Sequence, residues 1–85
     1  MDKRIGVIGI VIEDRNKVAD IINETLSQYG DIILGRMGLP SRELDLSLMA
    51  LLVEGTPDQV GAMTGKLGNL DGVSIKSGLT SKVVE

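Results

Sequence analysis

The chain alternates twice between a short apolar run and an amphipathic segment. The first run, residues 5–12, has an apolar residue or a glycine at every position and is rich in isoleucine and valine. A run of this length and composition predicts a strand rather than a helix. Because odd and even positions are both apolar, we expect both faces of this strand to be covered.

Residues 15–29 have the spacing of an amphipathic helix. One face of that helix collects positions separated by three and four residues, namely Val18, Ile21, Ile22, Thr25, Leu26 and Tyr29. Asp14 precedes the segment and is predicted to cap its amino terminus. Gly30 follows it and is able to take the left-handed conformation that ends many helices.

The middle of the chain predicts two strands joined by a loop. Residues 31–38 form the first of them, with Ile32 and Leu34 on one face. Pro40 disfavours helical geometry at the residue before it, so we expect residues 39–43 to form a hairpin loop. Residues 44–54 predict a third strand, which is again apolar at odd and even positions.

A second helix begins after Gly55. Thr56 is a suitable cap, Pro57 suits the first helical position, and Gln59 completes a capping box. The apolar stripe of this helix is formed by Val60, Met63, Leu67 and Leu70. Residues 73–78 then predict a fourth strand with Val73 and Ile75 on one face, and residues 79–85 a loosely held tail.

Three glycines lie inside this second helix, at positions 61, 65 and 68. Each costs roughly 0.5–1 kcal/mol relative to alanine in a helix interior. We therefore expect close approach of another backbone to offset that cost.

The two halves of the chain repeat one pattern. Residues 5–13 match residues 46–54 at a constant offset, which places Gly9 over Ala50. Right-handed connections put the first and third strands side by side in the centre of a sheet. The prediction is a single α+β domain over residues 1–85, a ferredoxin-like βαββαβ sandwich with antiparallel sheet order 4-1-3-2 and two helices on one face.

This fold leaves the second face of the sheet bare and apolar, which is rare on a monomer. We therefore expect that face to pack against another copy in a homodimer or homotetramer, although the alternation does not tell which residues point outward. The edge strand that contains residues 35–38 is a further candidate for pairing across a two-fold axis.

Composition removes several classes of function. The 85 residues include no cysteine and no histidine, which excludes thiol and imidazole chemistry, and we expect neither a metal nor a cofactor. The net charge of −3 and the single aromatic residue, a tyrosine, argue against direct nucleic-acid binding. No apolar run is long enough to span a membrane, and we expect a cytoplasmic protein.

The central stretch, residues 35–43, is the main candidate site. Its G-x-x-G pattern has three interpretations: a clamp on a nucleic-acid backbone, glycines that permit a bulge or close packing at an interface, or a small-ligand site charged by two arginines. The candidate ligand-binding residues are Gly35, Arg36, Met37, Gly38, Arg42 and Glu43.

Three carboxylates form a second candidate. We expect Glu13, Asp14 and Glu54 at adjacent ends of the two central strands, where they would serve acid/base chemistry or bind Mg²⁺. The plainer interpretation makes them solvated loop charges and a helix cap.

Several motifs in order resemble those of one family. They are Glu13-Asp14-Arg15, Tyr29-Gly30-Asp31, Gly35-Arg36-Met37-Gly38 with Pro40 and Arg42-Glu43, and Gly65-Lys66-Leu67-Gly68. Over about residues 4–82 the chain resembles the iron-only hydrogenase system regulators. The resemblance implies an ACT-like fold, similar to the ligand-sensing domain of the nickel-responsive repressor, and a regulatory role in hydrogenase maturation, with transcription as one level of control.

Two departures limit what the resemblance implies. The nickel-responsive repressor binds its metal through histidine and cysteine, and this chain has neither. ACT domains that bind amino acids usually place a glycine in the loop before the first helix. Here residues 15–17 are Arg-Asn-Lys, which argues against an amino-acid ligand.

Three functional hypotheses follow. The first is a stand-alone ACT-like regulatory module that senses a small-molecule effector or a regulatory protein partner at subunit interfaces near Arg36, Gly38 and Arg42. The second is a structural oligomerisation or docking protein with no ligand. The third is a small enzyme that uses the three carboxylates; because no nucleophile–base pair is visible, we expect no enzymatic activity.

Overall fold

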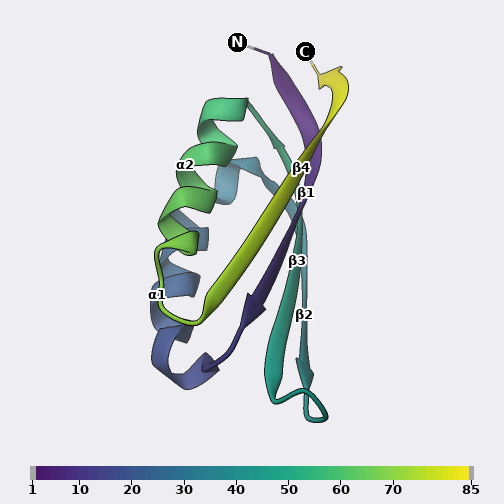
Figure 1. Ribbon diagram of the computed structural model, residues 1–85. Coiled ribbons are helices and arrows are strands. Elements are labelled where there is room, and N and C mark those ends of the chain that lie inside the picture. The colour runs from purple at the N-terminus through teal and green to yellow at the C-terminus, as the bar shows by residue number, and fades with distance from the viewer. Residues whose placement is uncertain (1, 85) are drawn as a thin grey trace.

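The computed structural model describes residues 2–84, which form a four-stranded antiparallel sheet with both helices on one face (Figure 1). The elements in chain order are β1 (Lys3–Ile12), α1 (Arg15–Gln28), a short 3₁₀ helix (Gly30–Ile32), β2 (Ile33–Ser41), β3 (Leu46–Gly55), α2 (Pro57–Gly68) and β4 (Val73–Val84). The sheet order is β2-β3-β1-β4. This order is the predicted 4-1-3-2 counted from the other edge, so the predicted ferredoxin-like βαββαβ fold is confirmed.

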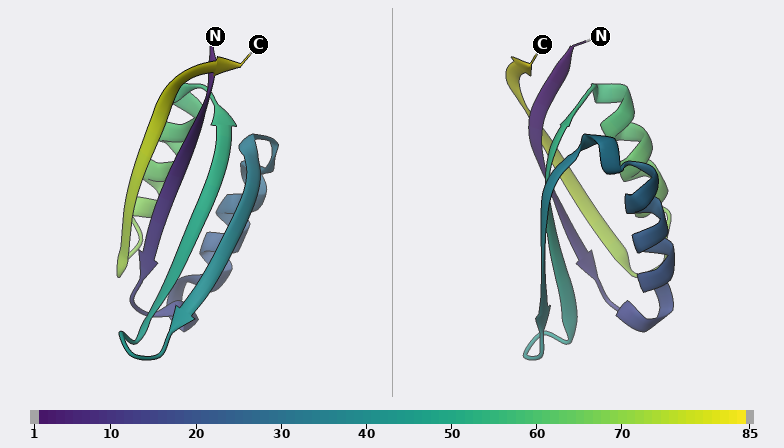
Figure 2. Two further views of the ribbon diagram at one scale, coloured as in Figure 1. Left: turned by 90° about the vertical axis from the view of Figure 1, so that its right-hand side faces the viewer. Right: turned by 180° about the vertical axis from the view of Figure 1, so that it is seen from behind.

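The two strands that the repeat relates, β1 and β3, are neighbours in the centre of the sheet (Figure 2). Their antiparallel register runs from Ile5 opposite Glu54 to Ile12 opposite Ser47, and Gly9 lies directly opposite Ala50. The sequence repeat makes Gly9 and Ala50 equivalent positions. An approximate two-fold axis therefore passes between them and relates the two halves of the domain.

The hydrophobic core lies between the sheet and the helices. The even-numbered residues of β1 and the odd-numbered residues of β3 point toward the helices, because successive side chains of a strand alternate between faces. The buried aliphatic residues are Ile8, Ile10, Ile12, Val18, Ile22, Leu26, Ile32, Leu51, Val53, Val60, Met63 and Leu67. Ile21, expected on the buried face of α1, is 48% exposed and lies at the margin of that face.

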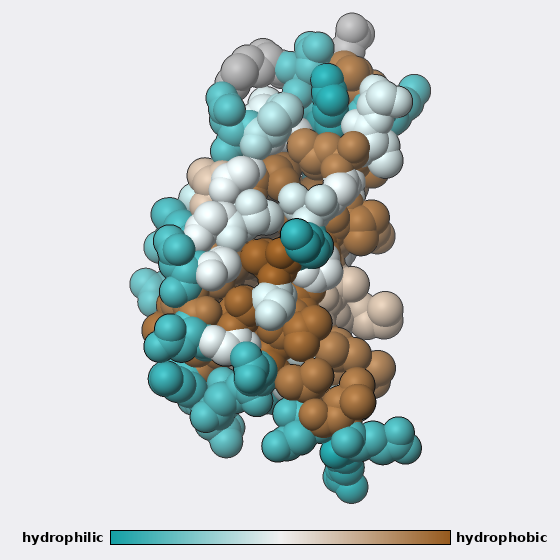
Figure 3. Space-filling view, in the orientation of Figure 1, coloured by the Kyte–Doolittle hydropathy of each residue, from teal (hydrophilic) through white to brown (hydrophobic). Residues whose placement is uncertain are grey.

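The sheet face turned away from the helices, here called the outer face, is exposed; it is largely apolar over β1, β2 and β3, whereas β4 contributes Ser74, Lys76 and Gly78. The most exposed of its large side chains are Val7, Leu34, Met37, Leu39 and Leu52, at 51% to 70%. Figure 3 shows hydrophobic residues gathered along the right-hand side of the molecule, the side of the sheet away from the helices. The structure thus settles which alternation points outward: the odd residues of β1 and the even residues of β3.

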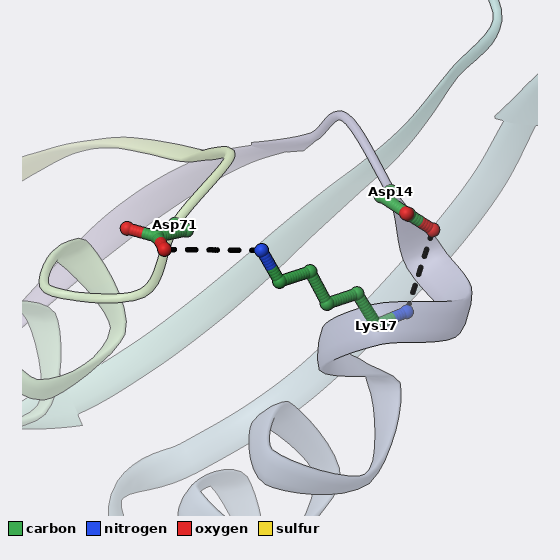
Figure 4. A network of polar contacts seen from close by, with 3 residues as sticks. All are labelled: Asp14, Lys17 and Asp71. Carbon is green, nitrogen blue, oxygen red and sulfur yellow. Dashed lines mark hydrogen bonds and ion pairs between the residues drawn. The ribbon is translucent and has the colours of Figure 1, made fainter.

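The amino terminus of α1 has the predicted cap. The Asp14 carboxylate accepts a hydrogen bond from the Lys17 backbone amide at 3.4 Å (Figure 4). The Lys17 side chain extends to Asp71 in the turn before β4, with Nζ to Oδ2 at 3.8 Å. Both partners of this ion pair are largely exposed, so it contributes little to stability.

The amino terminus of α2 also has its predicted capping box. The Gln59 amide donates to Thr56 Oγ1 at 3.2 Å, and the Thr56 amide donates to Gln59 Oε1 at 3.0 Å. Pro57 occupies the first turn of the helix, where its missing amide hydrogen is harmless. The capping box thus gives a hydrogen-bond partner to the backbone amides of Thr56 and Gln59, at the point where the chain leaves β3.

The predicted boundaries of β2 were wrong. The strand continues through Pro40 to Ser41, and the turn to β3 spans residues 42–45 rather than 39–43. Proline is tolerated here because β2 is an edge strand, which pairs with a neighbour on one side only. The glycine bulge, one of the alternatives for this stretch, is present as a register shift between Ile33 and Gly35.

The same bulge changes which residues share a face. Ile32 belongs to the 3₁₀ helix and is buried, whereas Leu34 is 58% exposed, so the two are not on one face as predicted. Gly30 does not take the left-handed conformation. Among residues 2–84, positive φ angles occur at Asp45 and Gly72, which lie in the turns before β3 and β4.

The fourth strand is longer than the predicted 73–78. It pairs with β1 as far as Val84, beyond an irregularity between Arg4 and Gly6. Thr80 Oγ1 donates to the Ile5 carbonyl at 2.7 Å, and Leu79 packs against the core. A Cβ atom on Gly6 would lie 2.5 Å from Leu79 Cδ2, so glycine at this position permits the pairing. Glu85, the end of the predicted tail, lies outside the described residues.

The glycines of α2 differ in their surroundings. A Cβ atom on Gly61 or Gly65 would meet nothing within 4 Å, so no other element within residues 2–84 approaches either residue. A Cβ atom on Gly68 would lie 3.2 Å from Ile75 Cγ2. The expected close approach is therefore found only at Gly68, against a side chain.

We predict that Gly61→Ala and Gly65→Ala each raise the free energy of unfolding by about 0.5–1 kcal/mol, because alanine is the better helix former and its methyl group enters open space. Chemical denaturation measures the change. Gly68→Ala is the matched control and gains less, because Ile75 has to move. Destabilisation by Gly61→Ala would show that this helix face is covered in solution.

Candidate functional site

The alternation along β2 divides the central motif between the two faces of the sheet. Arg36 and Gly38 lie opposite Leu51 and Met49 of β3 and face the helices. Gly35 and Met37 take the other alternation and belong to the outer face. Arg42 and Glu43 lie beyond the strand, in the turn. The predicted ligand residues are therefore distributed over three places.

A cavity of about 230 Å³ lies between α1 and the adjoining strands β2 and β3. It is lined by Ile12, Arg15, Ala19, Ile22, Asn23, Arg36, Gly38, Leu39, Pro40, Ser47, Leu48 and Met49. Of the predicted site residues, Arg36 and Gly38 line this cavity.

Two periodicities build the cavity. Arg15, Ala19 and Asn23 are four residues apart on α1, which places them on one side of the helix. Arg36 and Gly38 are two residues apart on β2 and so point toward α1. Gly38 leaves space in this wall, since a Cβ atom there would meet only the Leu48 carbonyl oxygen, at 4.0 Å.

The polar groups of the cavity are cationic or neutral. Its only charged lining residues are Arg15 and Arg36. Arg36 Nη2 donates to Asn23 Oδ1 at 3.4 Å, and within residues 2–84 neither arginine makes an ion pair. In a chain of net charge −3, this is a local concentration of positive charge. Guanidinium groups are shaped to bind carboxylate or phosphate oxygens in pairs.

A second, more open depression lies beside the cavity. It is lined by Glu13, Asp14, Arg15, Asn16, Pro40, Ser41, Arg42, Asp45, Leu46 and Ser47. Arg42 lies here and not in the cavity, and three carboxylates share the surface with it. The mixed charges make this depression a poorer place for an anion than the cavity.

The predicted grouping of carboxylates was wrong. Glu54 lies opposite Ile5, whereas Glu13 and Asp14 follow Ile12 at the other end of the same strand pair. The reason is that β1 and β3 are antiparallel, so the carboxyl end of β1 lies beside the amino end of β3 and the two carboxyl ends lie at opposite ends of the strand pair. Across residues 2–84, no three acidic side chains are arranged to hold a metal ion.

Sequence reasoning did not select Arg15, Asn23 and Ser47 for the site. The four-residue spacing of Arg15, Ala19 and Asn23 was the available signal, because it marks one flank of α1 beside its buried face. Identifying that flank as a cavity wall requires knowing that β2 lies next to α1. Ser47 lines the cavity because the pairing of β3 with β2 places it opposite Pro40.

The βαββαβ topology is an ACT-like, ferredoxin-like fold. The TM1266-like family, described as "Iron-only hydrogenase system regulator, putative", matches residues 4–77. The chain belongs to this family. It is 38% identical to the uncharacterized protein TM1266 from Thermotoga maritima, with a TM-score of 0.86 over 91% of this chain and 96% of that one.

More distant structures share the fold alone. A "putative glycine cleavage system transcriptional repressor" is 18% identical, with a TM-score of 0.68 over 94% of this chain and 47% of that one. The C-terminal domain of the MgtC protein from Mycobacterium tuberculosis is 15% identical, with a TM-score of 0.64 over 91% and 87% of the two chains. No curated protein matches the chain. Neither helix within residues 2–84 is long and apolar enough to cross a membrane.

We predict that Arg15→Ala and Arg36→Ala each change the free energy of unfolding by less than about 0.5 kcal/mol, because both side chains are exposed and free of ion pairs. Chemical denaturation of the two variants measures the change. Thr56→Ala is the comparison, and it loses about 1 kcal/mol with its capping box. A loss of that size at either arginine would indicate a structural role.

Proposed function

We propose that this protein is a regulatory module of the iron-only hydrogenase system that assembles as a homodimer or homotetramer and senses a small ligand. The observation that carries the proposal is the cavity between α1 and β2, which Arg15 and Arg36 both line without a carboxylate partner within residues 2–84. Two guanidinium groups that line one hollow and pair with no carboxylate favour an anionic ligand.

A regulatory rather than a catalytic role is supported by family membership and by the distribution of carboxylates. The family is described as regulators. Glu54 is at the opposite end of the strand pair from Glu13 and Asp14, so the three cannot act on one substrate atom. The proposal is therefore a binding protein without enzymatic activity.

Self-association is supported by the outer face. A chain of 85 residues has a small core, and covering the outer face with a second copy would bury its exposed Val7, Met37 and Leu52. At the centre of that face lie the small residues Gly9 and Ala50, opposite one another. A second sheet stacked about 10 Å away would place its larger side chains over this shallow centre.

The cavity and the outer face share two strand segments. Gly38 and Met49 face the cavity, and Leu39 and Leu48, one residue along each strand, belong by alternation to the outer face. If the two strand segments can take two arrangements and the ligand binds one of them more tightly, binding would also shift the packing on the outer face. Ligand binding would then change assembly or subunit geometry, since a ligand shifts an equilibrium only through differential affinity.

We predict that the wild-type mass in solution is a dimer or tetramer and that Gly9→Glu yields a monomer, because packing would bury the new carboxylate together with the neighbouring Lys76, and the desolvation of a buried ion pair costs more than the pair regains. Sedimentation or light scattering with refractive-index detection measures the mass. The separate chain tolerates the change: a Cβ atom on Gly9 meets nothing within 4 Å, and Lys76 lies opposite.

Gly9→Ala is the control, and it keeps the assembly because a methyl group fits a shallow apolar centre. A monomeric wild type, or an unchanged mass in Gly9→Glu, would refute assembly through the outer face. A docking protein without a ligand is the second candidate, which the outer face supports equally. It predicts an assembled protein whose melting temperature no small molecule changes.

A further inference from the structure

We propose that the cavity between α1 and β2 binds a small carboxylate that carries no amino group. Its carboxylate lies between Arg15 and Arg36, and its short apolar chain packs on Ala19 and Met49. This inference rests on the proposed sensing function and names the chemical class of the ligand.

The charge of the cavity selects the carboxylate. The two arginines belong to different elements, α1 and β2, and both line the same space. Asn23 accepts a hydrogen bond from Arg36 through Oδ1, which leaves its Nδ2 hydrogens for a ligand oxygen. Two guanidinium groups and an amide donor match the acceptor atoms of one carboxylate.

The size of the cavity limits the length of the ligand. Its volume is about 230 Å³. Drug-sized ligands occupy cavities of about 300–1,000 Å³, so a nucleotide is too large. A water molecule takes about 30 Å³ in the liquid, and the cavity thus corresponds to roughly seven or eight atoms of that size. A monocarboxylate of about five or six carbons has that many non-hydrogen atoms.

The opposite wall selects an apolar body. Ala19 and Met49 are half-buried and offer apolar surface to the cavity, whereas Ile12 and Ile22 at its inner side are buried in the hydrophobic core. Met49 adds a flexible thioether that packs against chains of different shape. A ligand with charge at both ends would leave one charge against this wall without a partner.

An amino group on the ligand is disfavoured for the same reason. No acidic side chain lines the cavity, and its two charged groups are both cations. An ammonium group next to the bound carboxylate would face Arg15 or Arg36 and have no carboxylate to pair with. Glu13, Asp14 and Asp45 line the neighbouring depression instead, outside the cavity.

The test is a titration of the full chain, labelled at the methionine methyl groups for NMR, with acetate, butyrate, hexanoate, 2-aminobutyrate and inorganic phosphate at constant ionic strength. Met49 lines the cavity and Met37 lies on the outer face, so the two methyl signals report separately on binding and on assembly. Butyrate is expected to shift the Met49 signal, with an affinity about fourfold higher for each methylene added beyond acetate until the cavity is full. The affinity for 2-aminobutyrate is expected to be at least tenfold lower than for butyrate.

Three variants locate the site. Arg36→Ala is expected to weaken butyrate binding at least tenfold, and Arg36→Lys to weaken it less. Lys82→Ala removes the same charge at the other end of the sheet, where β4 pairs with the start of β1, and is expected to leave binding unchanged. Gly38→Val fills the cavity from its open wall and is expected to abolish binding, with its melting temperature as the check on folding.

Several results would overturn the inference. Equal affinities for acetate and butyrate would remove the apolar wall from the site, and equal affinities for butyrate and 2-aminobutyrate would refute the exclusion of amino groups. A Met49 shift with phosphate alone would keep the anion site but refute the carboxylate class. If no probe moves Met49 in an assembled protein, the inference fails while assembly stands. If Met49 moves but Met37 and the mass do not, the ligand class stands and the proposed coupling to assembly fails.

Discussion

The antiparallel pairing of β1 with β3 is the constraint on which the rest of this structure depends. With Gly9 opposite Ala50, Ile8 and Ile10 point to the helices together with Leu51 and Val53. A shift of one residue in the register of either strand would turn all its inward-facing side chains outward and all its outward-facing side chains inward. Both sets are apolar in these strands, so the helices, which can cover only one face, decide which set becomes core. The other set remains exposed on the outer face.

The cavity is a consequence of the same arrangement at the edge of the sheet. The helix α1 lies over the β3 and β2 side of the sheet (Figure 2), and Gly38 of β2 supplies no side chain to fill the space between them. A larger residue at this position would fill part of the space. The missing side chain instead leaves a space whose inner wall is aliphatic and whose rim holds two arginines. Neither arginine makes an ion pair within residues 2–84, and Arg36 donates a hydrogen bond to Asn23 on α1.

The two features that support a regulatory function are separated by the thickness of one sheet. Strand alternation places the cavity on one side of residues 38–40 and 47–49 and the apolar outer face on the other. Displacement of these segments by a ligand would therefore reach the outer face, where we propose assembly, without passing through the core. Such a coupling needs only two packing arrangements of the outer face that the ligand binds with different affinity.

The sequence by itself determined the fold class, the sheet order, both helices with their amino-terminal caps, and the apolar character of both central strands. These follow from hydrophobic period, capping chemistry and an internal repeat, which are local properties. The extent of β2 through Pro40, the bulge at Gly35 and the separation of Glu54 from Glu13 were decided by the tertiary structure. Edge position and strand direction determine them, and both depend on neighbours distant in the chain. The distribution of the central motif over two faces of the sheet has the same origin. The G-x-x-G stretch was visible in the sequence. Only the register of β2 and the position of α1 place Arg36 in one cavity with Arg15 and Met37 on the opposite face.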